Sequence, residues 1–226
     1  MRQSILVLII IGFTSLASAQ THHVNSFFDS SDNESNIKNI FKLNRMGRFY
    51  YDKNWNAGNV YMNNGDTLSA YYLRYDLISN QLEIIIGNEI YAMRGESIKM
   101  FEWFNALSLK KEKFIRGFVD NGQQSTPSFL RVLQDGTLKL LKAKKVVAFK
   151  DATSPTLVSD TGADIQIMEL LYLEKDNSTY EITRSKRKNL AFINSSDVEQ
   201  YVSYNNLKFS NINDLRQIVT YYNDRQ

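Results

Sequence analysis

Three turn-forming dipeptides divide the middle of the chain into short apolar runs. They are Asn64-Gly65, Gly87-Asn88 and Asp135-Gly136, and each stands between stretches rich in β-branched and aromatic residues. Glycine and asparagine tolerate the positive φ angles that two-residue hairpin loops require. From Phe49 onwards the pattern therefore predicts antiparallel strands joined by tight turns, which is a β-meander.

The hairpin around Gly87-Asn88 can be specified residue by residue, because a two-residue loop fixes the register of its flanking strands. Both faces of this hairpin are then largely apolar. A half-exposed sheet alternates more cleanly, so we expect cover on two sides, by helices or by curling of the sheet. The expected pairs are Ile86 with Glu89, Ile84 with Tyr91 and Leu82 with Met93 on one face, and Ile85 with Ile90 on the other.

Further strand-like runs follow, and one long loop separates them. Residues 150–166 contain Pro155, Gly162 and several hydroxyl side chains, so we interpret them as a loop. The length of this loop makes it a candidate lid, although a loop without a function is the simpler interpretation. The expected strands cover residues 98–103, 114–119, 129–134, 138–149, 170–175 and 180–183.

After Thr183 the apolar spacing changes from two residues to nearly four, which is typical of helices. The segment that starts at Ser195 opens with hydroxyl and acidic residues, and Asn211 and Asp214 stand at capping positions of a second segment. The second segment carries one apolar stripe, which must be buried against the sheet. The stripe consists of Ile212, Leu215, Ile218, Val219 and Tyr222.

These patterns define the expected fold class as mainly β (α+β). We expect a curved antiparallel meander sheet of about eight to ten strands, partly closed like a barrel. Short C-terminal helices, at about residues 184–224, pack on this sheet. Residues 49–226 form a single β-rich domain in this interpretation, and the polar residues 20–48 form a poorly ordered leader.

The first residues indicate export. Arg2 precedes an apolar run at Ile5–Phe13, and the small residues Ala17–Ala19 form a cleavage pattern, so we predict a signal peptide cut between Ala19 and Gln20. The alternative is a membrane-spanning helix, which needs about 20 apolar residues; hydroxyl residues interrupt this shorter run. The mature protein is then expected in the periplasm or outside the cell.

Composition excludes several classes of function. The chain has no cysteine, so thiol chemistry and thiolate metal sites are excluded, and an exported protein of this kind must fold without disulfides. Its net charge is +3, and loss of Arg2 with the signal peptide would lower it to about +2. This weak charge does not favour nucleic acid as a partner.

The order of several short motifs resembles a group of small secreted, uncharacterised proteins of Bacteroidetes-type bacteria. The motifs are "WNAGNVYMNNGDTL", "LRYDLISNQLEI", "IYAM", "FLRVLQDGTLKLLK", "LYLEKDNSTYEI" and "NINDLRQIVTYYND". The resemblance covers Phe49 to Asn223. It implies an exported β-rich domain and no particular activity.

Candidate catalytic and metal-binding residues are few. His22 and His23 lie in the leader, where nothing holds an imidazole beside a nucleophile, and two adjacent imidazoles do not make a closed metal site. Asp29, Ser31 and Asn33 have the spacing of a calcium loop, but its central glycine and its twelfth-position glutamate are missing. We therefore expect no cofactor and no metal.

Paired carboxylates offer another route to catalysis, that of glycoside hydrolases. Glu83 and Glu89 are expected on opposite faces of their hairpin, and Glu96 and Glu102 flank a strand of unknown pairing. Neither pair is singled out as catalytic. A carboxylate-dependent hydrolase stays an alternative hypothesis.

Two basic clusters are also interpreted structurally. We expect Arg184, Lys186, Arg187 and Lys188 to form a solvated helix face, with anionic lipid or an acidic partner as the alternative. A second cluster lies along one strand, where lysines commonly prevent strand addition at a sheet edge. This second cluster consists of Lys139, Lys142, Lys144 and Lys145.

Arg74 and Asp76 lie two residues apart on an expected strand and therefore share a face. We interpret them as structural, with the guanidinium satisfied by a carboxylate or by helix-end carbonyls, and a ligand site is the alternative. Trp55, Tyr61 and Tyr91 are candidates for a glycan-binding row, although aromatic residues are also common core residues.

The sequence as a whole predicts an exported, non-catalytic cell-envelope protein. Such a protein would bind a partner protein or an apolar ligand such as a lipid, and a glycan-binding module is an alternative. An enclosed cavity lined by Ile, Leu and Phe would favour the lipid, whereas a large apolar patch or a long unprotected strand edge would favour a third possibility, a purely structural role in assembly.

Overall fold

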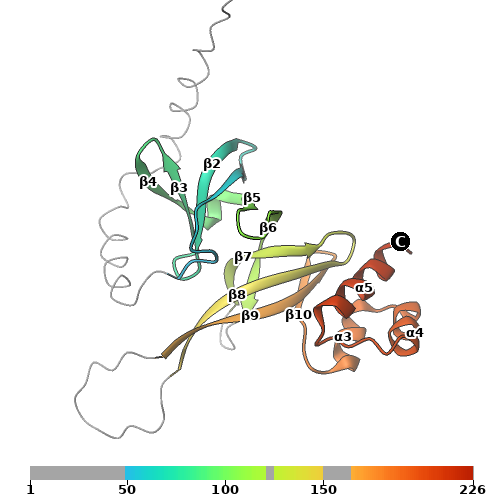
Figure 1. Ribbon diagram of the computed structural model, residues 1–226. Coiled ribbons are helices and arrows are strands. Elements are labelled where there is room, and N and C mark those ends of the chain that lie inside the picture. The colour runs from blue at the N-terminus through green and yellow to red at the C-terminus, as the bar shows by residue number, and fades with distance from the viewer. Residues whose placement is uncertain (1–48, 121–124, 150–163, 226) are drawn as a thin grey trace, which may run out of the picture.

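The computed structural model describes residues 49–120, 125–149 and 164–225. All ten strands in these ranges belong to one sheet (Figure 1). The fold is therefore mainly β with three short helices, as the sequence predicts. The strands are β1 (Asn56–Met62), β2 (Thr67–Asp76), β3 (Gln81–Ile86), β4 (Glu89–Arg94), β5 (Ile98–Asn105), β6 (Lys110–Asp120), β7 (Ser125–Gln134), β8 (Lys139–Phe149), β9 (Asp164–Lys175) and β10 (Ser178–Glu181).

The strand order is β10-β9-β8-β7-β6-β5-β1-β2-β3-β4, and all neighbours are antiparallel. The expectation of a simple meander is wrong at one point, because β5 pairs with β1 and not with β4. The short 3-10 helix η3 (Gly95–Ser97) turns the chain back after β4. Gly58 permits the close pairing, since a Cβ there would overlap the backbone of Glu102 and Trp103.

The turn at Gly87-Asn88 joins β3 to β4 with two residues, and the pairing of all six strand positions agrees with the expected register. Gly87 has a φ of +62°, the conformation that such a turn requires at its first position. The other two dipeptides lie in four-residue loops, so the expectation of two-residue turns is wrong there. In the first of these loops the side chain of Asn64 bonds both the backbone N–H and the carboxylate of Asp66.

Strands β1 to β7 curl around a core of aromatic rings. Phe101 stacks on Phe114 with ring centroids 4.6 Å apart, and Trp103 lies 4.6 Å from Phe114. Tyr75 meets Phe129 edge to face at 5.6 Å. All five side chains are buried. Aromatic pairs of this kind contribute about 0.5–1.5 kcal/mol each beyond the burial of their area. The curl is therefore filled by side chains.

The three helices gather at the other end of the molecule, beside β8 to β10 (Figure 1). They are α3 (Lys186–Ile193), α4 (Ser196–Tyr204) and α5 (Ile212–Asn223). Ser185, Ser195 and Asn211 cap their N-termini with side-chain oxygens, as the sequence predicts for the last two. Four residues of the expected apolar stripe of α5 are buried against β8 and β9, namely Leu215, Ile218, Val219 and Tyr222. The fifth, Ile212, is 37% exposed, so its expected burial is wrong. The other buried residues of this second core include Leu138 in the loop before β8, Leu140 of β8 and Leu173 of β9.

Strands β8 and β9 extend beyond β7 as a two-stranded arm (Figure 1). The described register of β7 with β8 covers only residues 140–142 of β8, whereas β9 pairs with β8 over its full length. Lys139 and Lys142 lie within the sheet and pair with Glu174 and Glu169, so the edge role expected for them is wrong. A sequence alone does not give the neighbours of a strand, which decide whether a lysine is at an edge.

The sheet does not close, and β4 and β10 form its two edges. Strand β9 begins at Asp164, so the last three residues of the expected loop 150–166 belong to a strand. Residues 150–163 of that loop lie outside the described residues, and so do residues 1–48, where the signal peptide and the leader with His22 and His23 are predicted. None of the described helices has the length and apolar character needed to cross a membrane.

Candidate functional site

Arg74 lies on the outer face of β2, opposite the aromatic core. Its guanidinium is held between two rings, 3.8 Å from the ring centroid of Tyr50 and 4.2 Å from that of Trp55. It also donates to one carboxylate oxygen of Glu83 on β3, through Nε at 3.1 Å and Nη2 at 2.7 Å. The hydroxyl of Tyr50 donates to the same carboxylate at 3.1 Å. This arrangement fixes the segment before β1 onto the sheet.

Asp76 shares the face of Arg74, but it has a different function in the fold. Its Oδ1 accepts the backbone N–H of Ile78 at 2.9 Å and that of Ser79 at 3.4 Å, which stabilises the turn into β3. The carboxylate that satisfies Arg74 is therefore Glu83, and the helices lie elsewhere (Figure 1). These contacts agree with the structural interpretation of Arg74.

A row of apolar side chains crosses five strands on the same outer face. The pairing aligns its members side by side across β5, β1, β2, β3 and β4. The exposed fractions are 49% for Phe104 and 56% each for Tyr72 and Ile90. Apolar side chains of this size are unusual as a contiguous exposed set. We call this set the outer apolar row: Phe104, Ala57, Tyr72, Ile85 and Ile90.

The outer apolar row contradicts one expectation from the sequence. Ile85 and Ile90 were expected to be covered, because both faces of their hairpin are apolar. The helices instead cover the far end of the sheet, and the curl encloses only the opposite face, which carries Leu73 and Ile84. The half-exposed Ile90 therefore lacks the predicted cover.

Charged groups flank the outer apolar row, and most are already paired. On one side lies the Arg74–Glu83 pair. On the other, Glu102 accepts from Lys111 at 2.6 Å, from Tyr61 at 3.0 Å and from Asn59 at 3.3 Å. Burial alone would raise the pKa of Glu102, but these three donors outweigh it and lower the pKa. On both sides of the row, the buried carboxylates Glu83 and Glu102 are therefore neutralised by cations of the same chain.

Glu112 is the third buried carboxylate of the described strands. It points into the curl, where the indole Nε1 of Trp103 donates to it at 3.0 Å and Arg131 contacts it at 3.0 Å. Each of the three buried carboxylates thus has its own cation. In the described ranges, no group of three or more acidic or histidine side chains is placed to hold a metal ion.

The aromatic residues proposed from the sequence do not form a row. Trp55 lies on Arg74, and Tyr61 uses its hydroxyl on Glu102 at the outer face of β1. Tyr91 stands opposite Ile84 on the core face of β4 and packs against the aromatic core. The expected glycan-binding row is therefore wrong as a set. The sequence does not give the strand order, which decides whether aromatic residues of different strands lie side by side.

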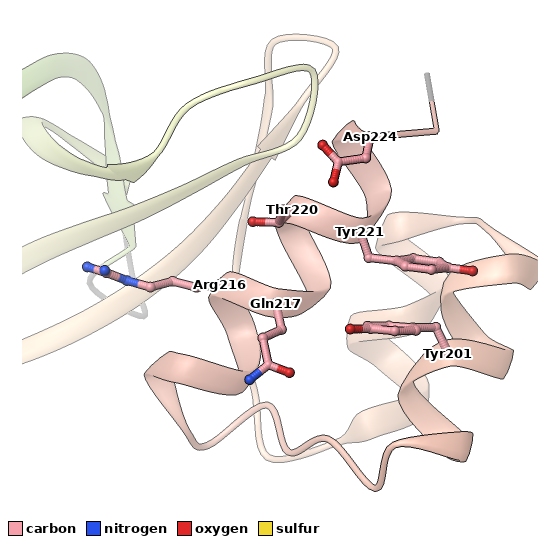
Figure 2. A pocket seen from close by; sticks show the side chains of 6 residues that line it. All are labelled: Tyr201, Arg216, Gln217, Thr220, Tyr221 and Asp224. Atoms are coloured by element: carbon pink, nitrogen blue, oxygen red, sulfur yellow. The ribbon is translucent and has the colours of Figure 1, made fainter.

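Two grooves lie near the helices. The first, of about 300 Å³, lies between α4 and α5, where the rings of Tyr201 and Tyr221 stack 3.8 Å apart (Figure 2). The second, of about 730 Å³, lies beside β10 and contains the half-exposed ring of Phe118. Polar groups surround that ring, and the Tyr172 hydroxyl donates to Glu181 at 3.2 Å. The second groove is lined by Phe118, Tyr172, Asn177, Thr179, Tyr180, Glu181 and Thr183.

The basic run at the start of α3 is solvent-exposed, as expected for a solvated helix face. Lys186 contacts the hydroxyl of Ser203 on α4 at 3.3 Å.

The outer apolar row and the Phe118 groove were not predicted from the sequence. The predicted pairing of Ile85 with Ile90 was the one available signal for the row.

No protein-family model, curated protein or solved structure matches this chain. The resemblance to secreted bacterial proteins therefore stays a prediction.

Proposed function

We propose that this chain is an exported, non-catalytic binding protein of the cell envelope, and that it binds a protein partner through the outer apolar row. The observation that carries the proposal is the exposure of Phe104, Tyr72 and Ile90 in one line across five strands. Export rests on the signal-like residues before Gln20.

The surroundings of the row favour a protein over other ligands. Protein interfaces commonly combine an apolar centre with a polar rim. Here the rim groups Arg74 and Glu102 are paired within the chain, so a partner need not supply a compensating charge. A lipid carrier would instead need an apolar interior space, and aromatic rings fill the curl. Catalysis is not proposed, because each buried carboxylate is engaged by its own cation.

Photocrosslinking in the cells that produce the protein tests this proposal. A photoreactive phenylalanine analogue placed at Tyr72 or at Ile90 is expected to give an adduct with one protein. The same analogue at Tyr204, an exposed residue of α4, is the matched control and should give no such adduct. The proposal fails if positions 72 and 90 give no protein adduct, or if position 204 gives the same product.

A saccharide ligand is the second candidate, and the groove beside β10 favours it. An exposed aromatic ring next to amide, hydroxyl and carboxylate groups suits a sugar, which has both C–H faces and hydroxyl groups. Phe118 supplies the ring, and Asn177 and Glu181 supply polar groups. Binding of cell-wall oligosaccharides, measured by titration calorimetry, should be lost in Phe118→Ala. Binding that survives this substitution would exclude the groove.

A further inference from the structure

The loop between β5 and β6 presents two leucines to solvent at the tip of a hairpin. Residues 106–109 form this four-residue turn, and the exposed fractions are 79% for Leu107 and 72% for Leu109. Leu109 also has a φ of +53°. This left-handed conformation is unfavourable for leucine and easy for asparagine or glycine. Leu109 is therefore unfavourable at this position for two reasons, its exposure to water and its backbone conformation.

The tip is held in a defined shape by side chains behind it. The Oδ1 of Asn105 accepts the backbone N–H of Leu107 at 3.0 Å and that of Ser108 at 2.8 Å. The Nδ2 of Asn105 donates to Asp52 at 2.9 Å, which connects the loop to the segment before β1. Both leucines are thus presented by an ordered turn.

Three lysines and the carboxylate of Asp52 belong to the segments at the base of the tip. Lys110 and Lys111 follow the turn directly, and Lys53 stands next to Asp52. Lys111 bonds Glu102 but remains largely exposed. The part of the chain that the structure describes contains no ion-pair partner for Lys53 or Lys110. The apolar groups therefore lie at the end of the protrusion, and the positive groups lie behind them.

This order of groups matches the depth profile of a bilayer surface. Apolar side chains enter the acyl region, while lysines at the level of the headgroups contact phosphates. We propose that the leucine tip, which we define as Leu107 and Leu109, inserts into an anionic phospholipid surface. The lysines at its base then bind the lipid phosphates. The tip lies on the same β5–β6 hairpin as Phe104 of the outer apolar row, which pairs with Lys111, so the two proposed contacts are neighbours.

Site-specific fluorescence tests the insertion, because the chain contains no cysteine to interfere with labelling. A polarity-sensitive label on Leu107→Cys should shift its emission to the blue with vesicles of phosphatidylethanolamine and phosphatidylglycerol. Vesicles of phosphatidylcholine alone should give no shift. The label on Tyr204→Cys is the matched control. Absence of a shift at position 107, or an equal shift at position 204, would overturn the proposal.

Vesicle flotation of the unlabelled chain provides a second measurement. The double variant Leu107→Ser/Leu109→Asn should reduce the fraction bound to anionic vesicles by about tenfold. Asparagine suits the left-handed position, so the hairpin itself should be retained. Salt at about 1 M should release the wild-type chain from the vesicles. The Debye length is then only about 3 Å, so the attraction between the lysines and the lipid phosphates is screened. Binding by the double variant at the wild-type level would exclude the tip as the attachment point.

Discussion

The ammonium group of Lys144 connects strand β8 to the segment that precedes β1. It donates to the backbone carbonyl of Tyr51 at 2.8 Å and lies 4.5 Å from the centroid of the Tyr51 ring. Burial lowers the pKa of Lys144. Tyr51 precedes β1 and Lys144 lies in β8, so this contact links the aromatic core to the base of the β8–β9 arm.

Tyr51→Phe should change the free energy of unfolding by no more than about 1 kcal/mol, because the buried Tyr51 hydroxyl makes no well-formed hydrogen bond among the described residues and interacts only weakly with Arg131. Burial also raises the pKa of Tyr51 well above its usual 10.0. Above about pH 10 the unfolded chain loses this proton and the folded chain keeps it, so stability falls as pH rises. Between pH 8 and about pH 11, the free energy of unfolding measured with urea should fall less in Tyr51→Phe than in Tyr204→Phe. Equal losses would contradict the assignment.

Arg74→Ala should lower the free energy of unfolding by about 3 kcal/mol, because it leaves the buried Glu83 without its guanidinium. Arg74→Lys should give an intermediate loss, since lysine keeps the charge but cannot repeat the two bonds to one oxygen. Urea titration of the three proteins measures both effects. An unchanged midpoint in Arg74→Ala, together with loss of binding to some ligand, would show that Arg74 belongs to a binding site.

Asn223→Ala should lower the free energy of unfolding by about 2 kcal/mol. The Asn223 side chain accepts from the backbone N–H of Leu138 at 2.8 Å and donates to the carbonyl of Leu138 at 2.9 Å. It thereby attaches the last turn of α5 to the loop before β8. Asn223→Asp keeps the bond that the side chain accepts and loses the bond that it donates. Its thermal midpoint should therefore lie between those of the unmodified chain and Asn223→Ala. A midpoint for Asn223→Ala equal to that of the unmodified chain would refute this attachment.

Tyr72→Thr and Ile90→Thr should change the free energy of unfolding by no more than about 0.5 kcal/mol, because both side chains are half exposed. Leu73→Ala, on the buried face of the same strand, should cost about 3 kcal/mol. Thermal unfolding of the three variants measures this contrast. A large loss in Tyr72→Thr would mean that the row is needed for folding, which would weaken its assignment as a binding surface.

Local signals predicted much of the fold. The Gly87-Asn88 turn fixed the register of β3 with β4, because a two-residue loop leaves no freedom in pairing. Ser195 and Asn211 marked the starts of α4 and α5 for a similarly local reason. The return of β5 to β1 was not predictable, because residues 98–105 carry no local mark of their partner strand. The edge role of Lys139 and Lys142 failed for the same reason.

The candidate site depended on such non-local information. Alternation placed Arg74 and Asp76 on one face, but Asp76 binds its own turn and Glu83 supplies the carboxylate. The alignment of Phe104 with Tyr72 follows only from the order β5-β1-β2. Likewise, an isolated sequence gives no sign that Leu109 adopts a left-handed conformation at an exposed tip.

The position of β1 between β2 and β5 also constrains how the molecule can fold. Asn59 of β1 bonds Glu102 of β5 across 43 residues, so β1 has one unpaired edge until β5 has been synthesised and has returned. An intermediate built from β1 to β4 would expose that edge to other chains. Pairing over such a distance is slow compared with hairpin formation. The folding rate should therefore respond more to substitutions in β5 than to those in the strands before it.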